Sequence, residues 1–157
     1  MLLYSCKSTP DLTGDEVYKI LNEIIADDSL SIHRICWKFN ELPLTGEYST
    51  VFTQQDKRFI TRQKSILTDS IIKPNKLKWY SHRKKSFDFI TIDTICDQGI
   101  LHHLSFPLIS ADRQKVVIEI TENCNCMLGG QGGKNLYEKK NGHWIRTNSF
   151  ERWISEK

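Results

Sequence analysis

From residue 86 to the end of the chain, apolar and polar residues alternate with the two-residue period of β-strands. Helical spacing of apolar residues is confined to two stretches before residue 70. Because no helix separates the later strands, the chain lacks the repeated βαβ units from which parallel sheets are built. The sequence therefore predicts an α+β fold, in which N-terminal helices pack on a mainly antiparallel β-sheet.

A hairpin near the C-terminus is the clearest of the predicted strand pairs. Two alternating runs, 136–140 and 143–146, are separated by Asn141-Gly142. A two-residue type I′ turn needs positive φ at both positions, which Asn and Gly tolerate best. Residues 116–121 supply the preceding strand, so the C-terminal region is predicted to form a β-meander. Earlier strands are predicted over 34–39, 87–95 and 102–108.

Two helices are predicted, over residues 14–26 and 54–67. Thr13 and Glu16 have the spacing of a capping box at the start of the first helix, and Thr53 is the predicted N-cap of the second. The first helix is predicted to bury a stripe of Val17, Ile20, Leu21, Ile24 and Ile25. The second is predicted to turn Phe59, Ile60, Gln63, Ile66 and Leu67 to the core, and its basic face carries Lys57, Arg58, Arg62 and Lys64.

The chain has the size and composition of one domain. Its 157 residues are 39% hydrophobic, enough to form a core, and they contain no internal repeat or Pro/Ser-rich linker. No apolar run approaches the roughly 20 residues that a transmembrane helix needs. The expected organisation is a single α+β domain over 11–157, preceded by an N-terminal tether over 1–10.

The N-terminal segment is similar to the end of a bacterial lipoprotein signal. Leu3, Ser5 and Cys6 match the leucine, the small residue and the lipidated cysteine of such signals, whereas Tyr4 is bulkier than usual. An intact signal has a charged and an apolar stretch upstream, so Met1 is expected to be a late start or the edge of a truncation. Cys6 is therefore the predicted lipidation site. The predicted location is the bacterial cell envelope, with the cytoplasm as the alternative.

The five cysteines are compatible with either location. Without Cys6 an even set remains, consisting of Cys36, Cys96, Cys124 and Cys126. In an oxidising compartment these residues allow two disulfides, whose connectivity the sequence does not determine. In the cytoplasm the same residues would be reduced thiols.

The order of motifs over residues 100–157 resembles that of a group of bacterial proteins. Leu104–Ser110 (LSFPLIS) precedes the strand 116–121, and Cys124–Gly133 (CNCMLGGQGG) precedes the hairpin at Leu136–Trp144 (LYEKKNGHW). This order resembles small lipoproteins and secreted proteins of Bacteroidota-type bacteria, most of which have no assigned function. The spacing Cys124-x-Cys126 is narrower than in that group. The resemblance implies an envelope location and a fold type, and it implies no catalytic residue.

The connection between strands 116–121 and 136–140 is the first candidate binding site. The expected connection, 122–134, exceeds the about two to five residues that join adjacent strands. Long loops on a rigid sheet are where binding residues tend to lie. The candidate residues are Cys124, Cys126, Gly129, Gly130, Gln131, Gly132, Gly133 and Lys134. A disulfide that only stabilises this connection is the structural alternative.

This glycine-rich stretch lacks the pattern of a phosphate loop or a zinc site. A Walker motif has Ser or Thr after its Gly-Lys pair, whereas Asn135 follows Lys134. Structural zinc sites use two ligand pairs with wider spacing than Cys124-x-Cys126, and adjacent strand residues such as His102 and His103 point to opposite faces. No metal or cofactor is therefore predicted.

The second candidate site is a basic and aromatic segment over residues 73–85. It belongs to a region, 51–85, that holds 10 basic and 2 acidic residues. Basic side chains neutralise phosphates and aromatic rings stack on bases, which predicts polyanion contacts at Lys76, Lys78, Trp79, Arg83, Lys84 and Lys85. A solvated basic edge, or contact with an anionic membrane, is the alternative interpretation.

The sequence contains no recognisable catalytic set. It favours a non-enzymatic cell-envelope lipoprotein or secreted binding module, with an unknown macromolecule as partner and the membrane contacted through a lipid anchor. Two alternatives stay open. One is a soluble nucleic-acid-binding module that uses 73–85, and the other is a thiol- or metal-dependent enzyme that uses Cys124–Lys134.

Overall fold

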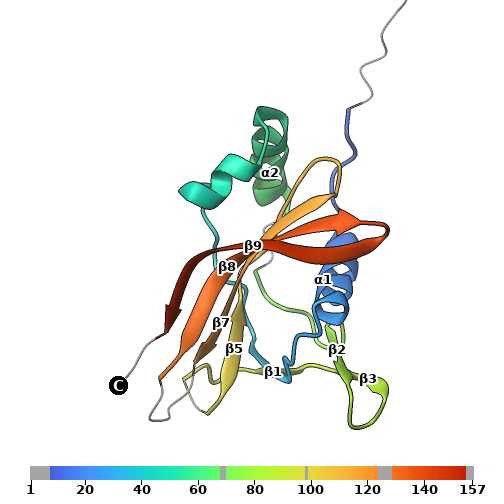
Figure 1. The fold of residues 1–157 in the computed structure, drawn as a ribbon, viewed down its shortest axis with the longest axis vertical. Helices are drawn as coiled ribbons and strands as arrows, with labels where there is room; N and C mark the ends of the chain where they lie inside the picture. The colour runs from blue at the N-terminus through green and yellow to red at the C-terminus, as the bar shows by residue number, and fades with distance from the viewer. Residues whose placement is uncertain (1–7, 68–69, 98, 124–128, 155–157) are drawn as a thin grey trace, which may run out of the picture.

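The structure is a computed structural model that describes residues 8–67, 70–97, 99–123 and 129–154. Its helices are α1 (Gly14–Asp27) and α2 (Gln54–Ile66), with a 3-10 helix η1 (Glu47–Val51) before α2. Its strands are β1 (Arg34–Cys36), β2 (Lys78–Ser81), β3 (Ser86–Phe89), β4 (Thr91–Asp93), β5 (Leu101–Leu104), β6 (Leu108–Ile109), β7 (Lys115–Asn123), β8 (Gln131–Lys140) and β9 (His143–Ile154). The α+β prediction is confirmed, since two helices pack on one mixed sheet (Figure 1).

The main sheet has the strand order β4-β1-β5-β7-β8-β9, with β6 beside β7, and β2 pairs with β3 separately. Strand β1 runs parallel to β4 and β5, and the other strand pairs are antiparallel. The predicted meander β7-β8-β9 and its Asn-Gly turn are confirmed, and both turn residues have positive φ, 51° at Asn141 and 81° at Gly142. Strands β8 and β9 are longer than predicted, because β8 begins at Gln131 and β9 continues to Ile154.

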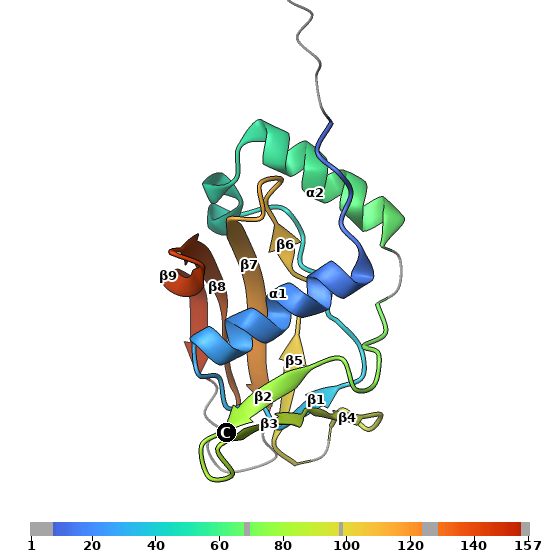
Figure 2. The same cartoon turned by 90° about the vertical axis from the view of Figure 1, so that its right-hand side faces the viewer.

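Helix α1 crosses one face of the sheet (Figure 2). All five residues of its predicted stripe are buried in one cluster with Val116, Ile118 and Tyr137 of the sheet. The capping box is only half formed, because Thr13 Oγ1 accepts from Glu16 N at 3.1 Å while the Glu16 carboxylate accepts from Arg113 Nε. Glu16 therefore links α1 to the turn before β7.

Helix α2 lies across the end of the sheet and begins with a complete capping box. Thr53 Oγ1 accepts from Asp56 N, and Asp56 Oδ2 accepts from Thr53 N at 3.0 Å. The second oxygen of Asp56 accepts from Ala111 N at 2.9 Å, which ties the helix to the turn between β6 and β7. Phe59 and Gln63 are buried as predicted, but Ile66 is 48% exposed. Figure 2 shows the last turn of α2 at the edge of the molecule.

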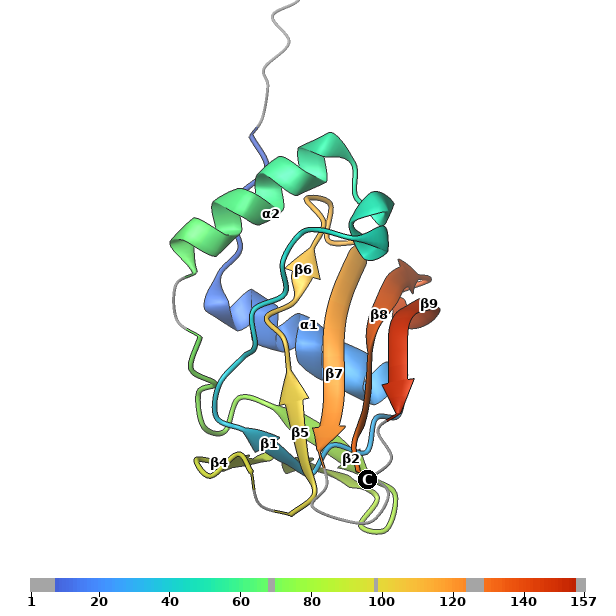
Figure 3. The same ribbon diagram turned by 90° about the vertical axis from the view of Figure 1, so that its left-hand side faces the viewer.

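The two faces of the sheet carry two apolar clusters. On β7, Val116 and Ile118 face α1, whereas Val117 faces a second cluster that contains Tyr48 of η1 and Phe150 of β9. Figure 3 shows η1 against this second face, near the start of β7. Because residues of a strand alternate between faces, the sheet is buried on both sides over its central strands.

Three predicted strands are shorter or divided in the structure. Residues 87–95 are split at Ile90, whose N–H donates to Leu77 O, so β3 joins the β2 hairpin and β4 joins the main sheet. Residues 102–108 are interrupted before Pro107, which has no N–H to donate, and form β5 and β6. The strand predicted over 34–39 ends at Cys36, where the alternation fails because Cys36 is buried next to Ile35.

Cys36 forms a disulfide with Cys96, across a sequence separation of 60 residues. The bond links the end of β1 to the segment between β4 and β5. Disulfides form and persist in oxidising compartments, so this bond indicates an extracytoplasmic location. The other cysteines, Cys6, Cys124 and Cys126, lie outside the described residues.

Among the described helices, none is long and apolar enough to cross a membrane.

Candidate functional site

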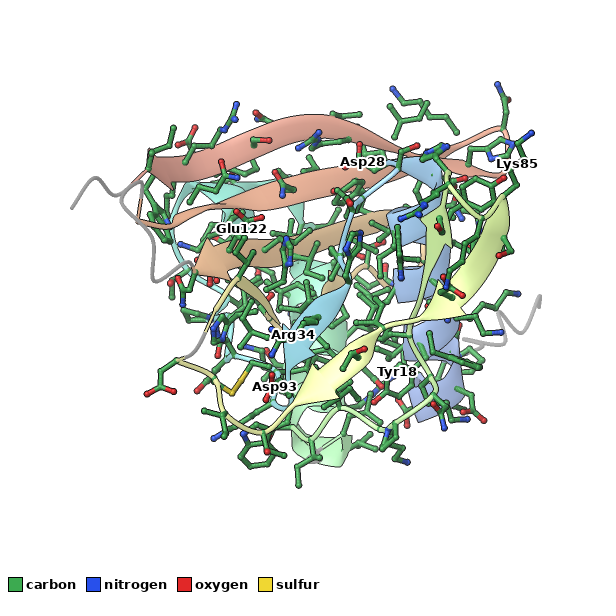
Figure 4. The ribbon with its side chains drawn as sticks, turned by 90° about the horizontal axis from the view of Figure 1, so that it is seen from below. Tyr18, Asp28, Arg34, Lys85, Asp93 and Glu122 are labelled. Atoms are coloured by element: carbon green, nitrogen blue, oxygen red, sulfur yellow. A yellow bond between two sulfur atoms is a disulfide. The ribbon has the colours of Figure 1, made fainter. Side chains whose placement is uncertain are left out.

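A groove of about 510 Å³ opens on the α1-facing side of the sheet, beyond the C-terminal end of α1. Figure 4 looks onto this end of the molecule, where Asp28 and Glu122 are labelled. The volume is in the range of small-ligand sites. The lining consists of Leu30, His102 of β5, Ile120 and Glu122 of β7, Gln131, Gly132, Gly133 and Asn135 of β8, and Arg146, Arg152, Trp153 and Ile154 of β9.

Glycines shape the floor of this groove for two different reasons. A Cβ at Gly132 would lie 2.9 Å from the Trp153 indole and 2.7 Å from Thr121 Cγ2, so only glycine fits beneath that ring. Gly133 points to the groove side, opposite to Gly132, because successive residues of a strand alternate. A Cβ there would lie 3.2 Å from Arg152 Cγ. The absence of a side chain at Gly133 therefore lets the Arg152 side chain lie across the floor of the groove.

A β-bulge places Arg152 against Gly133. Gly132 pairs with Trp153 and Lys134 pairs with Phe150, so two residues of β9 stand opposite Gly133 alone. One of them, Glu151, has a positive φ of 48°. A bulge bends its strand and re-aims side chains, and here it brings the Arg152 side chain to the groove.

A histidine–carboxylate pair forms one wall of the groove. His102 Nε2 lies 3.2 Å from Glu122 Oε2, across the β5–β7 pair. Burial lowers the pKa of His102, and the Glu122 charge acts in the opposite direction. On the floor, Asn135 Oδ1 accepts a hydrogen bond from Ser149 Oγ at 2.8 Å. The wall and floor thus offer both donors and acceptors to a ligand.

The two arginines of the groove differ in their partners. Arg146 Nε lies 3.4 Å from Asp28 Oδ2, and the same carboxylate accepts from Tyr137 Oη at 2.7 Å. Burial and the Asp28 carboxylate raise the pKa of Tyr137, so the phenol stays a donor. Within the described part of the chain, no carboxylate pairs with Arg152. Arg152 is the cation of this groove that is available to a ligand.

The structure brings together only part of the predicted glycine-rich site. Gln131, Gly132 and Gly133 line the groove. Lys134 points to the opposite face, where it pairs with Glu119 and Glu151. The expected thirteen-residue connection over 122–134 is wrong, because both flanking strands extend into it and only 124–130 joins them. Gly129 and Gly130 belong to this connection, and the predicted site residues Cys124 and Cys126 are not described.

The basic segment over 73–85 does not form a single surface. Lys76 pairs with Asp15 of α1, and Trp79 packs against the core with its ring 3.8 Å from that of His33. Lys78 lies on β2, and Arg83, Lys84 and Lys85 lie in the turn that follows β2. Trp79 therefore lies on the core-facing side of the hairpin, opposite to Lys78, and the predicted polyanion contacts of this segment stay a prediction.

Sequence reasoning missed Arg146 and Arg152 and had no context for Glu122. Glu122 becomes part of the groove because β5 and β7 are neighbours, a pairing that residue spacing does not show. The predicted strand 143–146 contained Arg146 at its end but stopped short of Arg152. The two buried residues of β9, Trp144 and Phe150, are six positions apart yet lie in clusters on opposite faces of the sheet, so local alternation gave no signal for a longer strand.

Comparisons with protein-family models, with curated proteins and with solved structures found no match. The resemblance of residues 100–157 to Bacteroidota-type lipoproteins therefore stays a prediction. Among the residues that the structure describes, no group of three His, Cys, Asp or Glu side chains is placed to hold a metal ion.

Replacing Gly132 by alanine is expected to lower the free energy of unfolding by about 1–3 kcal/mol, because the new methyl group overlaps the Trp153 ring and Thr121. The tightest contact of a Cβ at Gly133 is with the flexible Arg152 side chain, at 3.2 Å, and the nearest backbone atoms lie at 3.6 Å. For the matched change at Gly133 we therefore expect a loss under about 1 kcal/mol. Urea unfolding of both variants measures the difference. Equal losses would contradict the packing of Trp153 on Gly132.

The stability of the protein is expected to fall as the pH is lowered from 7.5 towards 5. Burial lowers the pKa of both His102 and His103 below the ordinary value of about 6.5. In that pH window the unfolded chain binds protons that the folded chain does not, so acid favours unfolding. Within the part of the chain that the structure describes, His103 Nε2 is buried and has no hydrogen-bond partner, which makes its protonation costly. Urea midpoints of the wild type and of a His102→Gln, His103→Gln variant at both pH values test this. An unchanged pH dependence in the variant contradicts it.

Proposed function

We propose that the chain is an extracytoplasmic binding module whose groove takes an acidic saccharide. The observation that carries this proposal is the Arg152 side chain at the groove, which lies against Gly133 and has no carboxylate partner among the described residues. A guanidinium binds a carboxylate through two parallel hydrogen bonds, which gives geometric specificity as well as affinity.

The rest of the lining fits the hydroxyl-bearing body of such a ligand. His102, Glu122 and Asn135 present planar groups that donate and accept hydrogen bonds. Leu30 and Ile120 supply apolar surface for the C–H face of a sugar ring. A groove with a few placed polar groups among apolar ones is typical of small-molecule sites. The uronic-acid unit of a larger glycan meets the same requirements, which agrees with a macromolecular partner.

A cell-envelope location is part of the proposal, with the chain lipid-anchored through Cys6 or secreted. The Cys36–Cys96 disulfide supports a compartment that is oxidising. Anchoring is tested by expressing the protein behind its natural upstream sequence and measuring its partition into detergent. We expect Cys6→Ser to release it into the aqueous fraction, and unchanged partition would remove the anchor from the proposal.

Titration calorimetry with glucuronate and with glucose tests the ligand class, since the two sugars differ in the carboxylate. We expect glucuronate to bind, and glucose to bind at least about tenfold more weakly. This ratio corresponds to the free energy of one hydrogen-bonded ion pair, which glucose cannot form. Arg152→Gln should remove this preference, and Gly133→Val should weaken both sugars by filling the floor. Arg58→Gln on α2 is the matched control, because that arginine is exposed and lies outside the groove.

Two results would overturn this function. One is that the wild type binds glucuronate and glucose with equal affinity, or binds neither sugar. The other is an equal loss of glucuronate affinity in Arg152→Gln and in Arg58→Gln, which would indicate a non-specific charge effect. Galacturonate and gluconate, tested in parallel, separate a requirement for a particular ring from a requirement for the carboxylate alone.

A further inference from the structure

The β2–β3 hairpin carries an exposed aromatic face that the groove does not use. Lys78 pairs with Phe89 and Tyr80 pairs with Phe87, so these four side chains share one face. Phe87 is 57% exposed and Phe89 is 52% exposed, unusual values for phenylalanines that lie side by side. The other face holds Trp79, which packs against the core.

Positive charge surrounds this aromatic face. Lys78 Nζ lies 5.1 Å from the centre of the Phe89 ring. The turn of the hairpin adds Arg83, Lys84 and Lys85, and Asp88 is the one acidic residue between 78 and 89. Asp88 pairs with Lys84, which leaves the remaining basic side chains of the hairpin without a described acidic partner.

The hairpin is fixed to the domain by hydrogen bonds at its base. Asn22 of α1 donates from Nδ2 to Lys76 O and accepts at Oδ1 from Lys78 N, both at 2.8 Å. Ile90 N donates to Leu77 O on the other strand of the base. The hairpin is therefore held in place at one end of the molecule (Figure 2).

We propose that this face docks on the anionic surface of a lipid bilayer. Phe87 and Phe89 enter the boundary between headgroups and acyl chains, while Lys78, Arg83 and Lys85 contact anionic headgroups. Interfacial binding needs apolar rings together with basic residues, and here Lys78 shares the face of the two phenylalanines while Arg83 and Lys85 lie in the adjoining turn. Complementary charge is the reason for choosing this partner over a neutral apolar surface.

The geometry of the rings favours a membrane over a single-stranded nucleic acid. The Tyr80 and Phe87 rings meet edge to face, with their centres 5.3 Å apart and their planes at 69°. Tyr80 and His82 meet at 84°. Successive bases stack on exposed, roughly parallel ring faces, which these pairs do not offer. Insertion into a bilayer has no such requirement.

A lipid on Cys6 would bind the protein to vesicles by itself, so docking by the hairpin has to be measured without the lipid. The full chain carrying Cys6→Ser provides this, and the groove is left unchanged so that the two proposals are tested separately.

Sedimentation with vesicles of phosphatidylcholine, with and without about one third phosphatidylglycerol, measures the docking. We expect binding only to the anionic vesicles and loss of binding at high salt. Arg83→Gln with Lys85→Gln should weaken it about 30-fold, and Phe87→Ser with Phe89→Ser at least about tenfold. The control Lys57→Gln with Arg58→Gln removes the same charge from α2 and should have little effect. All these side chains are partly or fully exposed, so melting temperatures should not change.

Absence of binding to the anionic vesicles overturns the proposal, and so does an equal loss in the α2 control. Binding of an oligo-dT strand without binding of vesicles assigns the face to nucleic acid instead. If a hairpin variant melts at a lower temperature, its loss of binding is not informative. The proposal is then tested by the salt dependence and the lipid dependence of wild-type binding, which do not require a substitution in the hairpin.

Discussion

Replacing Cys36 and Cys96 together by alanine is expected to lower the free energy of unfolding by about 4 kcal/mol. The bond closes a loop of 60 residues in the unfolded chain, and its removal returns that conformational freedom. In the folded chain it also fixes β1, which lies between β4 and β5 in the sheet. Urea unfolding of the oxidised wild type and of the double variant measures the loss.

Treatment with a reductant supplies the control for this experiment. It should lower the stability of the wild type to that of the variant and leave the variant itself unchanged. A wild type whose urea midpoint does not respond to the reductant would contradict the disulfide, and with it the main support for an extracytoplasmic location.

Ile24→Ala is expected to cost roughly 2–5 kcal/mol. Ile24 is 1% exposed and lies in the centre of the α1 stripe, against the strands that also form the groove. Truncation leaves a cavity that the surrounding sheet cannot fill. Because α1 covers the face on which the groove lies, ligand affinity should fall in proportion to the unfolded fraction and not further.

Lys19→Ala is the matched change on the exposed face of the same helix, and it should alter stability by less than about 0.5 kcal/mol. Thermal unfolding of both variants gives the comparison. Similar melting temperatures for Ile24→Ala and the wild type would contradict the packing of α1 on the sheet.

The elements that the sequence predicts well are those fixed by local chemistry. The α1 stripe has a strict helical spacing, and Asn141-Gly142 suits only a tight hairpin turn. The end of α2 is harder to predict, because Ile66 continues the helical pattern but is 48% exposed. The spacing of apolar residues predicts which side of a helix faces the core, but it does not predict how much of the helix is covered by the sheet.

The groove depends on contacts that are remote in the sequence. Without knowledge of their neighbours in the fold, Gly132 and Gly133 predict a loop, because glycine is disfavoured in β-strands. In the structure, Trp153 packs over Gly132 and compensates for the missing side chain. Neither the length of β9 nor the bulge that directs Arg152 is encoded in a local motif. The prediction therefore identified some of the residues of the site but not its shape or its cation.

The most direct test of the proposed binding function is a titration of the isotope-labelled full chain with glucuronate, followed by NMR. The amide signals of Gly132 and Gly133 and the Nε signal of Arg152 should shift together with one dissociation constant, and glucose should cause no comparable shift. Signals of the hairpin 78–89 should stay in place. Shifts that are absent from the groove, or that occur only outside it, would contradict the assignment of the groove as the ligand site.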